Sequence, residues 1–151
     1  MTFLSGKVTR HTLPVLRKTG AGASVGGSVP PPGPGDMKRL LLPQGELAQI
    51  CGGEDEIRYI AYAELQMGGT RGNHYHEFKQ ESLYIISGEI LLWVQDIDSN
   101  LRDSIPLRTG ELLVIGTRVA HALQIVTPGH AIEYSPAKFD PADVYPFRLF
   151  E

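Results

Sequence analysis

The sequence lacks several features that would place it in a specialised class of protein. It has one cysteine, Cys51, so no disulfide can form within the chain, and this cysteine usage suits a reducing compartment. No apolar run approaches the roughly 20 residues that cross a bilayer. The formal charge of −3 leaves no basic surplus, which nucleic-acid-binding domains usually carry. We therefore expect a cytoplasmic protein that binds neither nucleic acid nor a membrane.

Glycine and proline, by contrast, are abundant, with 17 glycines and 11 prolines among 151 residues. Residues 19–36 are mostly glycine, proline and small side chains, which predicts a linker. Residues 1–36 are thus predicted to form an N-terminal arm with its linker, and residues 37–151 a single folded domain. The first 35 residues carry basic but no acidic side chains, as transit peptides do, but they show no clear amphipathic helix. An arm that packs on the body or on a neighbouring subunit is therefore favoured.

Short segments with β-strand patterns follow the linker. Residues 57–67 place apolar side chains at every second position, which indicates a strand with one buried face. Residues 82–86 and 89–95 are β-rich runs joined at Ser87-Gly88, which predicts a hairpin. Further short strands are expected over residues 112–115, 122–126 and 130–134. Many short strands with no long helical pattern predict an all-β fold, a closed barrel or jelly roll.

The segment over residues 68–89 carries residue types that ligate metals. His74 and His76 are two apart, so on a strand both imidazoles point to the same side. A bend after them would bring the Glu81 carboxylate back on a paired strand, and His121 comes from a later strand. Three imidazoles and one carboxylate suit Zn, Fe, Ni, Mn or Co better than Ca²⁺ or Mg²⁺. We predict that these four side chains hold one divalent transition metal ion, whose identity stays open.

The spacing of these residues resembles the first motif of the cupin family. That motif is a glycine, five residues, His-x-His, three or four residues, a glutamate, six residues and a glycine. Every fixed position is matched here, by Gly68, His74, His76, Glu81 and Gly88. The long spacing and the chemistry of the fixed residues make this motif specific.

A second cupin motif is matched in part. It begins at Gly110 and places His121 at the expected offset. The family's proline, second glycine and asparagine are replaced here by Gly116, Arg118 and Ile125. These departures change turn chemistry and leave the ligand set intact. The resemblance covers roughly residues 57–136, and it implies a double-stranded β-helix that holds the metal inside the barrel.

A narrower resemblance concerns cupins that modify nucleotide-linked sugars. The run RGNHYH at residues 71–76 is similar to their motif, and residues 139–145 are similar to the end of the capsular-polysaccharide type. In the related metal-free 3,5-epimerases, such a segment supplies a phosphate-binding arginine and a base histidine. Carried over, Arg71 would hold a phosphate and His74 would be a base. This chain departs from those enzymes by keeping a second histidine and a glutamate, which favours a metal.

Further candidates surround the predicted metal site. Arg71 lies near His74 and Arg118 lies three residues before His121, so either guanidinium could anchor a phosphate or carboxylate. Lys79 is expected to be solvated. The strand tyrosines either pack in the barrel wall or supply a general acid. The candidates for that catalytic role are Tyr84 and Tyr134, with Tyr59 as a third strand tyrosine.

Two classes of function compete for such a site. A metal-dependent enzyme would act on a small molecule, first as an isomerase or epimerase of a sugar or keto-sugar and second as a dioxygenase. The alternative is a non-catalytic cupin that only binds a small ligand. Because barrel edges can pair between two copies, and the arm can exchange between them, we expect a homodimer.

Overall fold

The structure is a computed structural model that describes residues 1–17, 36–54 and 56–150. The linker predicted over residues 19–36 falls outside the described residues except at its last position. Contacts group the chain into two compact units, one of Met1–Arg10 with Ile57–Glu151 and one of His11–Glu56. This grouping differs from the division at residue 37 expected from the sequence, which stays a prediction. Within the described ranges, no helix has the length and apolar character of a membrane span.

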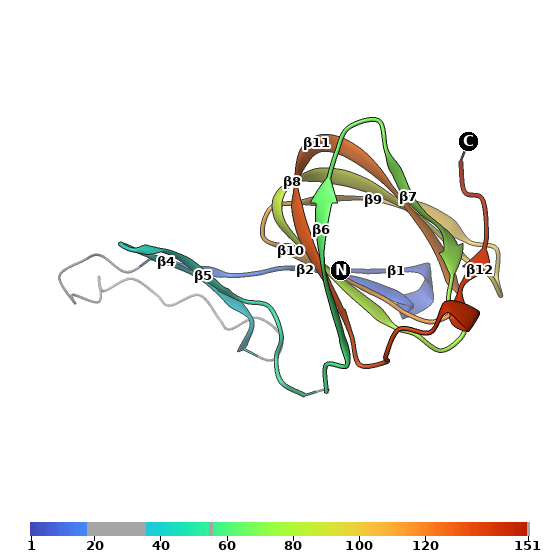
Figure 1. The fold of residues 1–151 in the computed structure, drawn as a ribbon, viewed down its shortest axis with the longest axis horizontal. Helices are drawn as coiled ribbons and strands as arrows, with labels where there is room; N and C mark the ends of the chain where they lie inside the picture. Colours follow the sequence, from blue (N-terminus) through green and yellow to red (C-terminus); the bar gives the residue numbers. More distant parts are fainter. Residues whose placement is uncertain (18–35, 55, 151) are drawn as a thin grey trace. The chain divides into compact units, whose positions relative to one another are not determined.

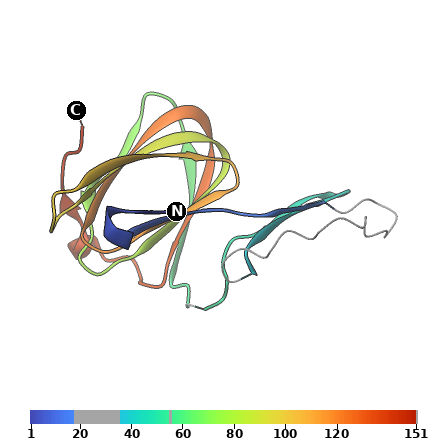
Figure 2. The ribbon, with the colours of Figure 1, turned by 180° about the vertical axis from the view of Figure 1, so that it is seen from behind.

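Nine strands among the described residues form one sheet, which curls into a barrel (Figures 1 and 2). The pairing follows the order β1-β2-β10-β8-β11-β7-β12, with β6 also on β11 and β9 also on β8. The all-β jelly-roll fold predicted from the sequence is therefore confirmed. The strands are β1 (Thr2–Phe3), β2 (Val8–Thr12), β6 (Tyr59–Leu65), β7 (Thr70–Tyr75), β8 (Glu81–Asp96), β9 (Arg102–Arg108), β10 (Glu111–Ile115), β11 (Val119–Ser135) and β12 (Tyr145–Pro146). Two short 3₁₀ turns lie between strands of this sheet, η1 (Leu4–Gly6) between β1 and β2 and η3 (Pro141–Asp143) between β11 and β12.

Two long strands replace the shorter ones that the sequence predicted. The prediction of a hairpin at Ser87-Gly88 was wrong, because β8 continues through these two residues. Likewise, β11 continues through residues 127–129, between the two short strands that the sequence predicted. The two irregular stretches lie opposite each other, and the register of β11 on β8 shifts there. A Cβ on Gly129 would lie 1.9 Å from the Ser87 carbonyl oxygen, and Gly88 has φ +91. The glycines therefore allow a bulge and a close backbone approach within paired strands, where we had predicted turns.

The barrel interior is packed with alternating apolar side chains from the sheet. Many of these side chains are fully buried, and each large aliphatic one contributes roughly 1.5–3 kcal/mol by leaving water. This core supports the rigid strands on which the polar site is built. The largest fully buried members of this core on β8 to β10 are Ile85, Ile90, Leu92, Val94, Ile105, Leu107 and Leu113.

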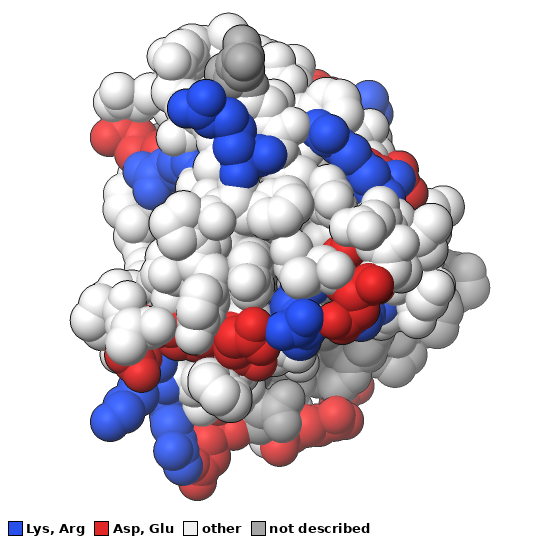
Figure 3. Space-filling model, turned by 90° about the vertical axis from the view of Figure 1, so that its right-hand side faces the viewer, with Lys and Arg blue, Asp and Glu red and all other residues white. Residues whose placement is uncertain are grey.

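A second apolar cluster lies on the outer face of β11. The small side chains of Ala120 and Ala122 leave room there for Leu149 from the C-terminal segment. Tyr75, Trp93, Ile97, Phe147 and Phe150 pack around it. Figure 3 shows the side of the molecule that bears this end of the chain, with uncharged atoms at its centre and acidic and basic groups around them. The C-terminal segment is thus part of the packed structure.

The smaller unit contains a three-stranded sheet with the order β3-β4-β5. β4 (Lys38–Leu42) pairs in parallel with β3 (Val15–Arg17) and antiparallel with β5 (Gly45–Gln49). The Arg39 guanidinium contacts the Glu46 carboxylate at 2.5 Å and holds the pKa of that carboxyl below its usual value. None of the predicted site residues lies in this unit.

Candidate metal centre

The structure brings the four predicted metal ligands together. β7 supplies His74, the residue after β7 is His76, β8 begins at Glu81 and β11 supplies His121. Pairing of β7 with β11 places His74 directly across from His121. One ligand atom from each of the four side chains lies within 4.8 Å of the others. Strand parity and strand pairing together thus converge the four side chains on one point.

Backbone carbonyl groups fix two of the imidazoles. Nδ1 of His76 donates to the carbonyl oxygen of Asp143 at 2.6 Å, and Nδ1 of His121 donates to that of Val119 at 3.1 Å. A carbonyl oxygen only accepts, so the proton of each neutral ring is on Nδ1 and Nε2 carries a lone pair. These Nε2 atoms lie 3.2 and 3.0 Å from the two carboxylate oxygens of Glu81. Lone pairs and a carboxylate facing one another require a metal cation or a shared proton between them.

The charges within this cluster shift its pKa values strongly. Burial by itself would raise the pKa of Glu81, but the charge and hydrogen bond of His121, the contact with Nε2 of His76 at 3.2 Å and the charge of Lys79 hold it well below its usual range. Burial alone would lower the pKa of His121, but the Glu81 carboxylate raises it overall. Burial and the two neighbouring histidines lower the pKa of His74 to about 4. His74 is therefore a neutral imidazole at pH 7, the form that binds metals.

This donor set fits a divalent transition metal. Zn, Fe, Ni and Mn all accept imidazole nitrogen together with carboxylate oxygen. The Nδ1 contacts of His76 and His121 to carbonyl oxygens are the contacts that usually orient metal-bound histidines. Nε2 of His76 is buried and finds no well-formed hydrogen bond among the described residues. A metal ion would give this nitrogen, and the lone pair of His121, a partner of the right charge.

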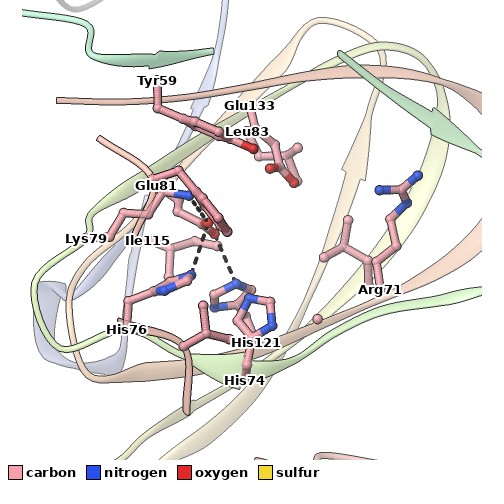
Figure 4. A pocket seen from close by; sticks show the side chains of 14 residues that line it. Tyr59, Arg71, His74, His76, Lys79, Glu81, Leu83, Ile115, His121 and Glu133 are labelled. Carbon is pink, nitrogen blue, oxygen red and sulfur yellow. Dashed lines mark hydrogen bonds and ion pairs between the residues drawn. The ribbon is translucent and has the colours of Figure 1, made fainter. Parts of the chain in front are cut away.

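The metal ligands line a cavity of about 270 Å³. Figure 4 shows the histidines on one side of the Glu81 carboxylate and Tyr59 and Glu133 on the other, while Arg71 stands apart across the cavity. The remaining wall is mostly apolar. Its members include Leu83, Ile115, Leu123, Phe139 and Val144. A small polar molecule that enters this cavity would meet the metal ligands and four further polar side chains, those of Tyr59, Arg71, Lys79 and Glu133.

Lys79 is buried in this wall, so the prediction that it is solvated was wrong. Only 6% of its surface is exposed, and its ammonium lies 3.0 Å from Oε1 of Glu81. The same nitrogen lies 4.1 Å from the ring centre of Tyr59 and 5.8 Å from that of Phe139. The aromatic faces and the carboxylate together stabilise the buried cation. Lys79 thereby occupies one oxygen of Glu81 and leaves the other for a metal.

Glu133 is a cavity residue that the sequence analysis missed. Burial, followed by repulsion from Glu81, raises its pKa above the usual value. Because a break was predicted at residues 127–129, the orientation of Glu133 could not be derived from that of His121. Had strand parity been continued from His121 through the bulge, it would have placed Glu133 on the inner face. A carboxyl group with a raised pKa inside a cavity is suited to accepting and returning a proton.

The two candidate catalytic tyrosines are not brought to the cavity. Tyr84 and Tyr134 are buried, with 3% and 9% of their surfaces exposed. Tyr84 has the opposite parity to Glu81 on β8, and Tyr134 follows the inward Glu133 on β11, so both face away from the metal ligands. Neither is among the residues that line the cavity, whereas Tyr59 is.

The two candidate arginines lie in different places. Arg71 lines the cavity, and its Nη2 donates to the carbonyl oxygen of Glu64 at 3.2 Å. Arg118 does not line the cavity and instead contacts the carboxylates of Glu77 at 2.6 Å and Asp98 at 2.8 Å. Because both of these ion pairs already satisfy Arg118, only Arg71 is positioned to anchor a ligand at the predicted metal site.

Comparison with known proteins agrees with this architecture. Residues 61–134 match the family model of the cupin domain. This range contains all four predicted metal ligands, Arg71 and Glu133. No curated protein matches the chain.

Several solved structures share the fold at low identity. A 3,4-ketoisomerase from Helicobacter canadensis is 17% identical with a TM-score of 0.63, over 72% of this chain and 84% of that one. A dTDP-6-deoxy-D-glucose-3,5-epimerase from Legionella pneumophila, in complex with dTDP-4-keto-L-rhamnose, is 15% identical with a TM-score of 0.64, over 76% and 71%. The capsular polysaccharide assembling protein CapF from Staphylococcus aureus is 20% identical with a TM-score of 0.56, over 63% and 29%. At such identities these likenesses show the fold alone.

Proposed function

Residues 61–134 form a cupin domain, and we propose that the protein is a metal-dependent isomerase or epimerase of a sugar or keto-sugar. One observation carries the proposal. Nε2 lone pairs of two orientated histidines and the Glu81 carboxylate converge in a cavity that also contains the Glu133 carboxyl group. A cation site beside a proton-transferring group is what proton abstraction next to a carbonyl requires.

The metal would be held by His74, His76, Glu81 and His121, and it would polarise a substrate carbonyl or hydroxyl oxygen. The identity of the ion stays open among Zn, Fe, Ni and Mn. Lys79 keeps its ammonium on one oxygen of Glu81, at 3.0 Å. This contact would limit Glu81 to one metal bond and keep space on the ion for substrate.

Glu133 is the proposed proton carrier. Its carboxylate would remove the proton from the carbon next to the substrate carbonyl. Delivery of a proton by water to the opposite face of the same carbon gives epimerisation. Return of the proton from Glu133 to the former carbonyl carbon, while the neighbouring hydroxyl proton passes to the former carbonyl oxygen, gives isomerisation. Neither outcome needs an oxidant or a reductant. Burial and Glu81 raise the pKa of Glu133, which strengthens it as a base at neutral pH. We assign Tyr59 and Arg71 to substrate positioning, because both line the cavity.

The size of the cavity supports a sugar-sized substrate. At about 270 Å³ it lies just below the range of roughly 300–1,000 Å³ found for drug-sized ligands. A sugar ring fits this volume, while a nucleotide attached to it would extend outside. The solved structures named a 3,4-ketoisomerase and a 3,5-epimerase are consistent with a keto-sugar substrate.

An iron-dependent dioxygenase is the second candidate. The observation in its favour is the donor set, since histidine and carboxylate ligands also suit non-haem iron. The buried Lys79 and the half-buried Glu133 beside the ligands favour a polar sugar over the apolar substrate expected above an oxygen-binding iron. Metal analysis and oxygen consumption separate the two reactions. A cupin that binds the sugar without converting it is the remaining alternative.

We also propose that the protein works as a homodimer. Ile60 and Tyr62 project from β6 with 66% and 63% of their surfaces exposed. Among the described strands β6 pairs with β11 alone, so its second edge can accept another strand. Light scattering on the wild type and on Ile60→Lys tests this assembly. A dimer that the variant turns into a monomer supports it, and a monomeric wild type contradicts it.

The central experiment combines metal analysis with deuterium exchange. Protein purified without added metal or a histidine tag is analysed for bound metal, alongside His76→Ala. The loaded wild type is then incubated in D₂O with free and nucleotide-linked keto-sugars, and NMR follows deuterium at the carbon next to the carbonyl. Glu133→Gln should bind metal normally and slow exchange by about 10²–10⁴-fold, as loss of a general base does.

Glu64→Gln is the matched control, because its side chain is exposed on β6. It should exchange like the wild type. Loss of metal in His76→Ala together with exchange that requires Glu133 supports the proposal. Absence of metal after reconstitution with Zn, Mn, Ni and Fe(II) contradicts it. Oxygen consumption by the iron-loaded protein without deuterium exchange would replace it with the dioxygenase.

A further inference from the structure

A buried carboxylate near the C-terminus holds the loop that follows His76. Asp143, with 7% of its surface exposed, accepts hydrogen bonds from three successive backbone amides. The N–H of Glu77 donates to Oδ1 at 2.8 Å, and those of Phe78 and Lys79 donate to Oδ2 at 3.2 and 3.1 Å. Successive N–H groups that point to one side form an anion-binding nest. Here the anion comes from the protein itself, more than 60 residues further along the chain.

The main chain of the same residue contacts the metal centre directly. The carbonyl oxygen of Asp143 accepts from Nδ1 of His76 at 2.6 Å, and this bond sets the tautomer that turns Nε2 towards Glu81. One residue therefore holds His76 through its backbone and the following three residues through its side chain. Both the ligand and the loop leading to the next ligand depend on where Asp143 is docked.

The residues after Asp143 continue along β7. Tyr145 pairs with Tyr75, and Pro146 pairs with His74. Asn73 fastens the same stretch, because its backbone oxygen accepts from the N–H of Phe147 at 2.7 Å. The side-chain oxygen of Asn73 also accepts from the N–H of residue 149 at 3.0 Å. The segment thus contacts residues 73–75, the half of β7 that carries the first metal ligand.

We propose that residues 143–149, the C-terminal clasp, position the metal ligands, and that Asp143 is the positioning residue that couples docking of the clasp to metal affinity. The inference rests on the proposed metal centre, but it makes no use of the sugar chemistry. Without the clasp, three amides on residues 77–79 lose their acceptor, and His76 loses the partner that orients it. The ligands would then have to be ordered by the ion, which weakens binding. Because coupling is reciprocal, a bound ion must also stabilise the docked clasp.

Zinc binding to the full chain tests the coupling. The zinc affinity is measured by competition with a chelating dye for the wild type, Asp143→Ala and Asp140→Ala. Asp140 is the matched control just before the clasp, because it is exposed and its carboxylate accepts from the N–H of Ala142. Asp143→Ala should bind zinc about 10- to 100-fold more weakly, the usual loss when a contact behind a metal ligand is removed. Asp140→Ala should bind like the wild type.

Hydrogen exchange on the wild type gives a readout that needs no variant to fold. Zinc should slow exchange at the amides of residues 77–79, whose acceptor is Asp143 in the clasp. It should also slow exchange at the amides of clasp residues 147 and 149, whose acceptor is Asn73 on β7. Asp143→Asn, which keeps the size and one acceptor oxygen, serves as a milder variant and should lie between wild type and Asp143→Ala. A merely structural role would lower the unfolding temperature of these variants and leave the zinc affinity of the folded protein unchanged.

The outcomes separate this inference from the proposed function. Unchanged zinc affinity in Asp143→Ala, an equal loss in Asp140→Ala, or zinc-independent exchange at residues 77–79 would overturn the clasp while leaving the isomerase proposal intact. Weakened zinc binding and zinc-dependent protection in a protein that converts no keto-sugar would support the clasp and contradict the proposed reaction.

Discussion

The proposed metal centre and a neighbouring charge network contain similar side chains, but their carboxylates face different partners. The charge network consists of Lys7, Glu77, Asp96, Asp98 and Arg118. Each of its carboxylates faces a cation, with Lys7 at 2.6 Å from Asp96 and Arg118 at 2.6 Å from Glu77. In the metal centre, the Glu81 carboxylate instead faces two imidazole nitrogens that carry lone pairs, beside a single lysine. The carboxylates of the network are already paired with cations, whereas the imidazoles and the carboxylate of the centre need a metal cation or a shared proton between them.

The largest effect should come from removing the central carboxylate. We expect Glu81→Gln to abolish stoichiometric metal binding, because a neutral amide neither offsets the charge of a divalent ion nor binds it strongly. Elemental analysis of purified protein measures this. Glu77→Gln is the matched control from the charge network and should retain one ion per chain. Equal metal content in both variants would show that the two clusters do not differ as described.

Removal of the metal should be the next largest change. An ion that binds only the folded state stabilises it by about 4 kcal/mol when its free concentration is about 1,000 times Kd. Denaturant unfolding with and without a chelator should show a loss of this order in the wild type. In Glu81→Gln the chelator should have no effect. A wild-type stability that does not respond to chelation would mean that the centre holds no ion in solution.

Removing the cation beside the most buried carboxylate of the charge network should lower the free energy of unfolding by less than removal of the metal does. The Asp96 side chain is 5% exposed, so Lys7→Met leaves a buried carboxylate without its cation, at about 1–3 kcal/mol. Burial alone would raise the pKa of Asp96, but the hydrogen bonds from Lys7 and Ser99 lower it overall. Stabilisation by a carboxyl with a lowered folded pKa is present above its unfolded value near 4 and is lost as the pH falls through the folded pKa.

The difference in unfolding free energy between wild type and Lys7→Met should therefore be full at neutral pH and shrink below about pH 4. Urea unfolding at a series of pH values checks the direction. Zinc affinity should be the same in both proteins. A difference that grows as the pH falls would mean that Asp96 is not the group stabilised by Lys7.

The smallest effect should come from the exposed end of the network. Hydrogen bonds from Arg118 and Lys7 lower the pKa of Asp98 to about 2, but its side chain is 52% exposed. Water and salt screen such pairs. Asp98→Asn should leave both the unfolding midpoint and the metal content unchanged within error. A clear drop in the unfolding midpoint that is the same at low and high salt would show that Asp98 and its cations are better shielded from solvent than their exposure indicates.

Much of the site could be predicted from the sequence because it depends on local rules. The two-residue spacing of His74 and His76 and the parity of His121 follow from strand geometry alone. The convergence of Glu81 depended on pairing between strands, and the family motif supplied that information. The all-β fold followed from short alternating segments and frequent turn residues.

The errors came from contacts between distant segments. Ser87-Gly88 looks like a turn in isolation, but its glycine sits against residues 127–129 within a paired strand. Because a break was expected there, strand parity was not extended from His121 to Glu133, and its place in the cavity was missed. Lys79 looked solvated because neither its ion pair nor its aromatic neighbours can be read from its local sequence. Tyr84 and Tyr134 lie on strands as predicted, but their parity relative to Glu81 and Glu133 turns both away from the metal ligands.

The position of Asp143 in the chain sets an order on the assembly of the metal centre. Synthesis from the N-terminus delivers His74, His76, Glu81 and His121 before the acceptor that orients His76. A nascent chain that has emerged only as far as β11 therefore contains every ligand but lacks the carboxylate and carbonyl of residue 143. The proposed site can reach its final geometry only after residue 143 has been synthesised, so binding of a metal there would report that the clasp has been made and has docked.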